Sequence, residues 1–187
     1  QWTGYVDTVA DYYRKQSFGK LNISGQVFDW YTAKHERAYY DYRKDELVAE
    51  AAEYYRSQGV DFSQFDGNAD GILDGVIYHF AGQYSTDAAS PWYPGVNYDV
   101  SGQVGDLRFT RVIQICEDAR ADETNLIVTA CHELMHSLGM PDLYSDIFVV
   151  QRLIDDLMSA ANAGYINPYT KLLLGWIDEA KVITGDM

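Results

Sequence analysis

The sequence lacks any long apolar run, and no segment approaches the ~18 residues of a transmembrane helix, so we expect no membrane insertion. Basic residues are also scarce: 14 Lys and Arg stand against 28 Asp and Glu, giving a net charge of -14. A surface this negative repels phosphate backbones and anionic lipids, which argues against nucleic-acid or membrane-surface partners. The same carboxylates favour divalent cations.

Proline and cysteine are few, and no internal repeat, low-complexity tract or linker-like stretch is present. The 187 residues, 47% of them hydrophobic, therefore fit one globular domain with its own core. Cys116 and Cys131 leave two alternatives open: one disulfide, or two buried thiols. The chain starts at Gln1 without a Met or a signal peptide, so we expect a trimmed or mature fragment.

Apolar spacing predicts a mixture of helices and strands without a regular βαβ alternation, which is typical of an α+β fold. The stretch before residue 107, rich in Gly, Pro and Tyr, is expected to be a loop. The predicted helices cover residues 5–16, 45–59, 122–139 and 168–175, and the predicted strands cover residues 21–32, 75–81, 107–116 and 180–183.

One predicted helix carries His132, Glu133 and His136 in an H-E-x-x-H pattern. Residues four apart lie on one helix face, so both imidazoles can reach a single cation. Glu133 is one position further round, beside the metal's open position. Two histidines for zinc and a carboxylate for its water are what metal-assisted peptide hydrolysis needs.

The residues after this motif supply a third ligand. Gly139 tolerates the left-handed turn that lets the chain leave the helix and swing back under the metal, and Asp142 can then complete a His2Asp set. The alternative for Asp142 is a cap or turn residue beside Pro141. The competing ligands in that case are Asp146, Asp155 and Asp156.

Several segments resemble the secreted immune inhibitor A-like (M6) zinc metallopeptidases of the metzincin clan. They are residues 12–20, 61–74, 132–144, 157–158 and 171–176. The resemblance implies a single catalytic domain, 1–187, with a metzincin-like twisted mixed sheet. Its upper lobe, 1–139, holds the active-site helix, and its smaller lower lobe, 140–187, is mostly irregular and helical. The resemblance also implies His132, His136 and Asp142 as zinc ligands.

Two further residues take roles only through this resemblance. Met158 is expected to form a methionine turn beneath the zinc, the alternative being a plain core methionine. The acidic residues before it and Ser159 after it depart from the family pattern. Tyr165 is the candidate for stabilising the oxyanion, the alternative being an ordinary packed tyrosine.

An acidic loop places oxygen atoms at alternating positions, with Gly71 for a sharp turn. This D-x-N-x-D-G arrangement supplies the oxygens that calcium prefers, although Ile77 stands where an EF-hand has its glutamate. The alternative is a set of Asx turns that needs no ion. The expected structural calcium ligands are Asp66, Asn68, Asp70, the Ile72 carbonyl and Asp74.

The sequence thus predicts a secreted, monomeric zinc endopeptidase acting on proteins or peptides, with Glu133 as general base and then general acid. The alternative function is a zinc- and calcium-stabilised binding module with lost or narrow peptidase activity. The intact Glu133 argues against it, since a structural zinc site needs no base. His79 is expected to be a satisfied core or cleft histidine rather than a ligand.

Overall fold

A computed structural model describes residues 4–87, 89–117, 123–143, 156–159 and 164–178. The chain divides into two compact units. Gly25–Ser137 forms one, which we call the sheet unit; Gln1–Ser24 and Leu138–Met187 together form the other, which we call the helical unit.

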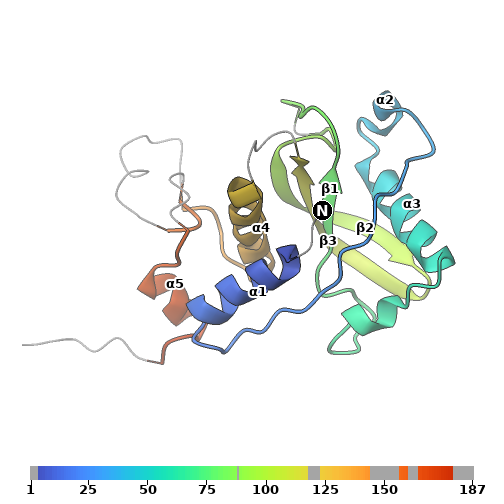
Figure 1. Ribbon diagram of the computed structural model, residues 1–187. Helices are drawn as coiled ribbons and strands as arrows, with labels where there is room; N and C mark the ends of the chain where they lie inside the picture. Colours follow the sequence, from blue (N-terminus) through green and yellow to red (C-terminus); the bar gives the residue numbers. More distant parts are fainter. Residues whose placement is uncertain (1–3, 88, 118–122, 144–155, 160–163, 179–187) are drawn as a thin grey trace, which may run out of the picture. The chain divides into compact units, whose positions relative to one another are not determined.

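The sheet unit is built on a mixed three-stranded sheet with the strand order β1-β3-β2 (Figure 1). The central strand β3, Leu107–Cys116, is parallel to β1, Ile77–Phe80, and antiparallel to the edge strand β2, Gly95–Val104. A two-residue turn joins β2 to β3, and its Gly105 has a φ of 58°. Such a left-handed residue is what tight hairpin turns require.

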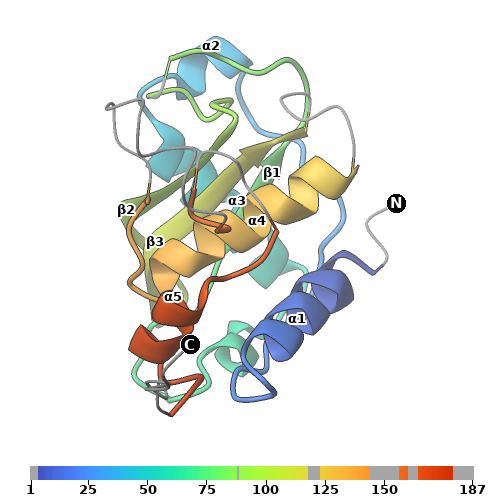
Figure 2. The same cartoon turned by 90° about the vertical axis from the view of Figure 1, so that its left-hand side faces the viewer.

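Two helices cover opposite faces of this sheet, as Figures 1 and 2 show: α3, Lys44–Ser57, and α4, Glu123–Ser137. Helix α3 packs on β2 through an apolar core, whereas α4 packs on both β2 and β3. The short elements α2, Arg37–Tyr40, and η1, Phe62–Phe65, flank α3 in the chain. The core under α3 consists of Val48, Ala52, Leu73, Val100, Val104, Phe109 and Val112.

The helical unit joins the two ends of the described chain. Tyr13 of α1, Tyr5–Gln16, makes an edge-on contact with Trp176, their ring centroids 6.3 Å apart. The Lys20 ammonium donates to the Gly175 carbonyl at 2.9 Å. Helix α5, Pro168–Leu173, is capped by the side chain of Asn167, whose Oδ1 accepts from the Thr170 N–H at 2.9 Å.

Most predicted elements are confirmed. The four predicted helices correspond to α1, α3, α4 and α5, and two predicted strands correspond to β1 and β3. The mixed sheet agrees with the predicted α+β class. Among the helices of the described residues, none combines the length and the apolar composition needed to cross a bilayer.

Two predictions about strands are wrong. Residues 21–32 form no strand, because the aromatic side chains of this segment pack along α3 instead of alternating across a sheet. Phe28 stacks on Tyr55 at 4.9 Å, and the Tyr31 hydroxyl donates to the Glu50 carboxylate at 2.5 Å. The loop expected before residue 107 contains β2, which pairs with β3 through a two-residue turn although its Gly, Asn and Asp residues are types depleted in strands. The strand predicted over 180–183 lies outside the described residues.

Candidate metal centre

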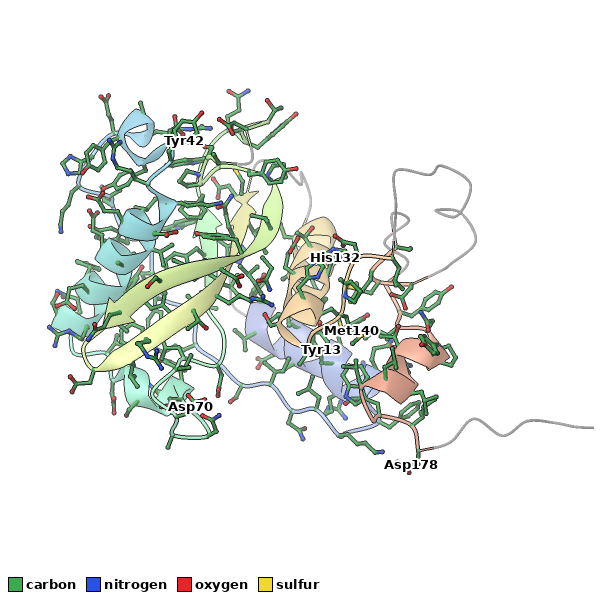
Figure 3. All side chains as sticks on the ribbon, turned by 180° about the vertical axis from the view of Figure 1, so that it is seen from behind. Tyr13, Tyr42, Asp70, His132, Met140 and Asp178 are labelled. Carbon is green, nitrogen blue, oxygen red and sulfur yellow. The ribbon has the colours of Figure 1, made fainter. Side chains whose placement is uncertain are left out.

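Helix α4 presents both histidines of the motif on one face. Their ring centroids are 5.1 Å apart and the ring planes stand at 85°. His132 is buried, at 8% exposed, and His136 is half-buried. Figure 3 shows His132 on this helix. The spacing predicted from the i, i+4 rule is therefore realised.

The chain leaves α4 after Ser137, and Gly139 takes a left-handed φ of 86°, as predicted. Within the short stretch 132–142, one ligand atom from each of His132, His136 and Asp142 lies within 4.8 Å of the others. Two imidazoles and a carboxylate are a donor set that zinc takes in catalytic sites, so these residues fit the expected metal. Across the ranges that the structure describes, no other trio of His, Cys, Asp or Glu gathers in this way.

Glu133 lies beside this trio and outside it. Its side chain is buried, with the residue 7% exposed, and its Oε2 is 4.0 Å from the His136 Nε2. On its other side the carboxylate faces β2 at Gly95, where an added Cβ would stand 3.5 Å from Oε1. A shielded carboxylate next to a metal ligand is placed to exchange a proton with a reacting group at the metal.

Asp156 is used elsewhere and does not compete for the metal. This fully buried carboxylate accepts from the Met158 N–H at 2.7 Å and from both the backbone N–H and the Nδ2 of Asn167 at 2.7 Å. Asp146 and Asp155 lie outside the described residues. Of the candidate carboxylates that are described, the structure thus brings Asp142 to the histidines.

A comparison with protein families matches residues 3–87 to the catalytic domain of the immune inhibitor A peptidases, family M6. Over these residues the chain matches the M6 peptidase family. The match confirms the predicted resemblance over residues 3–87, which end before β2. The motif on α4 lies outside these residues and is a separate indication of the same family. M6 peptidases are zinc-dependent metallopeptidases, and the match supports a peptidase activity for this chain. No curated protein matches the chain significantly.

Met158 is fully buried, and its carbonyl accepts from the N–H of Leu143 at 2.9 Å. Leu143 directly follows Asp142, so Met158 supports the backbone of the segment that carries the candidate third ligand. Tyr165 is 44% exposed, and its carbonyl accepts from the Leu157 N–H at 2.6 Å. The methionine-turn role of Met158 and the oxyanion role of Tyr165 stay predictions.

The acidic loop of the M6 domain, where Figure 3 labels Asp70, is closed by its own side chains. The two carboxylate oxygens of Asp66 accept from the N–H groups of Asp70 and Gly71 at 3.0 and 2.9 Å. Asp74 Oδ2 accepts from the Gly67 N–H at 2.9 Å. The Asx turns of the alternative interpretation are formed by Asn68 and Asp70, whose Oδ1 atoms accept from the N–H groups two residues later, those of Asp70 and Ile72, at 3.1 and 2.8 Å. Calcium binding by Asp66, Asn68, Asp70, Ile72 and Asp74 stays a prediction.

Burial governs the remaining titratable candidates. It lowers the pKa of His79 on β1 to about 4, which keeps this imidazole neutral at pH 7. His79 is not part of the trio at the metal centre. Cys116 and Cys131 are both buried, and burial raises the pKa of the Cys131 thiol to about 12. A thiol this weakly acidic is not a nucleophile near neutral pH.

The residues of β2 and β3 that contact α4, above all Asn97 and Arg111, were not predicted. Asn97 was missed because β2 was taken for a loop. Arg111 lies on the predicted strand 107–116, but no local pattern indicates its contact with α4. The dipeptide Gly105-Asp106, directly before the predicted strand 107–116, is a hairpin signal that could have revealed β2.

Proposed function

We propose that this chain is the catalytic domain of a zinc-dependent endopeptidase of the metzincin clan. The observation that supports the proposal is the convergence of His132, His136 and Asp142, with the buried carboxylate of Glu133 beside His136. Zinc, when bound there, would polarise the scissile carbonyl and lower the pKa of a coordinated water.

In this proposal Glu133 handles the proton. Its carboxylate takes one proton from the attacking water while the bond from oxygen to the carbonyl carbon forms. It then gives that proton to the peptide nitrogen while the C–N bond breaks, so that the amine leaves neutral. Glu133 is shielded from bulk water. This suits the exchange, because burial makes a carboxylate hold a proton more readily than it does in water. The Tyr165 hydroxyl would donate to the oxyanion.

Glu133→Ala is the deciding variant. We expect it to keep the fold and one zinc per chain, measured by plasma mass spectrometry, and to lose at least about 100-fold in hydrolysis of an unfolded protein. Glu53→Ala is the matched control, because Glu53 lies on α3 and pairs only with Arg56 at the surface. Undiminished cleavage by zinc-loaded Glu133→Ala contradicts the mechanism.

The same assay separates the endopeptidase from a zinc-stabilised binding module. Chelator-sensitive cleavage by the wild-type chain supports the endopeptidase, and zinc binding without cleavage of any unfolded protein supports the binding module. No zinc after reconstitution contradicts both.

Calcium, secretion and a monomeric state complete the proposal. The D-x-N-x-D-G spacing supports calcium, and the test is whether calcium raises the melting temperature of the wild type and not of an Asp66→Asn, Asp70→Asn variant. Secretion is tested by locating the protein in culture medium or cells. Light scattering tests the monomer.

A further inference from the structure

The C-terminal half of α4 is held to the sheet by polar side chains of β2 and β3. Gly95, Asn97 and Asp99 occupy alternate positions of β2, so they share one face of the strand, and that face packs on α4. Arg111 of β3 is the cross-strand partner of Asp99. We call Asn97, Asp99 and Arg111 the helix clamp.

Asn97 binds the helix at two levels. Its Nδ2 donates to the Glu133 carbonyl at 2.7 Å and to the Ser137 Oγ at 2.9 Å. A carbonyl only accepts hydrogen bonds, so the amide orientation is fixed by its first contact. Because these two contacts lie one helical turn apart, they fix both the rotation of α4 and its position along the strand.

Arg111 holds the next part of the helix. Its Nη1 donates to the His136 carbonyl at 3.1 Å, while Nε and Nη2 donate to Asp99 Oδ1 at 3.1 and 2.9 Å. The His136 carbonyl lies in the last turn of α4. The ion pair with Asp99 therefore orients the guanidinium toward the end of this helix.

The clamp thus grips the backbone of two residues of the motif, Glu133 and His136. A shift or rotation of α4 would move the carboxylate and the imidazole together, and displacements near 1 Å cost about 100-fold in rate. We propose that Asn97, supported by Asp99 and Arg111, is a positioning residue that sets the geometry of the metal ligands and of the general base. This inference rests on the proposed function of the same site.

The test compares Asn97→Asp with Gln103→Glu. Asn97→Asp keeps the side-chain volume, removes the donor and turns a carboxylate toward the Glu133 carbonyl. Gln103 is the matched control, because it lies on the same strand and its Nε2 donates at 2.6 Å to the backbone carbonyl of Gly105, in the hairpin turn rather than on α4. Zinc affinity is measured by competition with a chromophoric chelator, and kcat and KM on a peptide.

We expect Asn97→Asp to bind zinc about 10- to 100-fold more weakly and to lose a similar factor in kcat with KM little changed, as for other outer-shell partners of metal ligands. Gln103→Glu should match the wild type. Wild-type zinc affinity and kcat in folded Asn97→Asp overturn the proposal, and so does a lower melting temperature with both unchanged, which would make Asn97 merely structural.

Two milder variants cover a failure of Asn97→Asp to fold. Asn97→Ala removes the donor without adding a charge. Arg111→Lys keeps the charge but cannot donate to Asp99 and to the His136 carbonyl with the several N–H groups of a guanidinium. Zinc affinity equal to that of the wild type in both overturns the proposal. The zinc measurement needs no hydrolysis, so a wild type that binds zinc and cleaves nothing contradicts the proposed function while the clamp is still tested.

Discussion

Gly95 occupies a position where a side chain has no room. A Cβ there would stand 2.7 Å from Thr129 Cγ2, a buried methyl group on α4, and 3.5 Å from the Glu133 carboxylate. The missing side chain lets β2 and α4 approach closely at the level of Glu133. Close approach of two elements is a common reason for glycine within a strand.

Gly95→Ala is therefore expected to destabilise the fold by about 1–3 kcal/mol, since the new methyl group overpacks this contact. Urea denaturation measures the loss. The double variant Gly95→Ala, Thr129→Ser removes the opposing methyl group, Cγ2, and should recover much of the stability. If Gly95→Ala is as stable as the wild type, β2 and α4 can move apart at this contact with little loss of stability.

His79 predicts a specific pH dependence of stability. Burial lowers its pKa to about 4 in the folded state, against 6.5 in the unfolded chain. Below pH 6.5 the unfolded chain therefore takes up a proton that the folded protein does not. The free energy of unfolding is therefore highest, as far as His79 is concerned, above pH 6.5. It falls by about 3 kcal/mol as the pH falls from 6.5 to 4.

In His79→Leu this part of the acid dependence should disappear. The free energy of unfolding, measured by urea titration at a series of pH values, should fall about 3 kcal/mol less between pH 7 and pH 4 than in the wild type. Parallel curves for the two proteins would contradict a depressed pKa at His79.

At the scale of elements, the buried side chain of Asp156 holds the turn 156–159 and the segment before α5 in place through hydrogen bonds. Asp156 accepts three hydrogen bonds, one from the turn itself at Met158 and two from Asn167, which in turn caps α5. The Met158 carbonyl accepts from Leu143, beside the third ligand. One carboxylate thus connects the turn, the start of α5 and the segment after α4.

Asp156→Ala leaves these donors without an acceptor and should lower the free energy of unfolding by about 3 kcal/mol or more, since each buried unsatisfied group costs 1–3 kcal/mol. Asp178→Ala is the matched control, because Asp178 pairs with Lys20 at the surface with its side chain 90% exposed. It should change stability little, because an exposed ion pair contributes little to folding. Similar losses in both variants would contradict the role of Asp156.

Elements also differ in how far the sequence predicts them. The helices follow from contacts three or four residues apart, and α1, α3, α4 and α5 were all predicted. Strand β2 was missed, although its partner β3 was predicted, because its Gly, Asn and Asp residues and the register shift between Asp99 and Gly102 hide the alternation of a strand. The aromatic segment 25–32 alternates like a strand but finds its partner in α3.

At the scale of the whole molecule, zinc bound at the proposed site would stabilise the folded state. A ligand that binds only the folded state stabilises it by mass action, about 4 kcal/mol when its concentration is a thousand times Kd. Chelation should therefore lower the melting temperature of the wild type in calorimetry, and added zinc should restore it. His136→Ala should respond to neither. A chelator shift that persists in His136→Ala would place the bound metal elsewhere.

The sequence by itself determined the helices, the pairing of His132 with His136, the place of Glu133 next to His132 and the resemblance to the M6 peptidases, because all of these depend on residues close together in sequence. The tertiary structure decided which carboxylate joins the histidines: Asp142 lies within reach of them, whereas Asp156 is engaged by Met158 and Asn167. It also decided the burial of His79 and the grip of Asn97 on α4. These depend on contacts between strands and helices far apart in the chain, which no local pattern encodes.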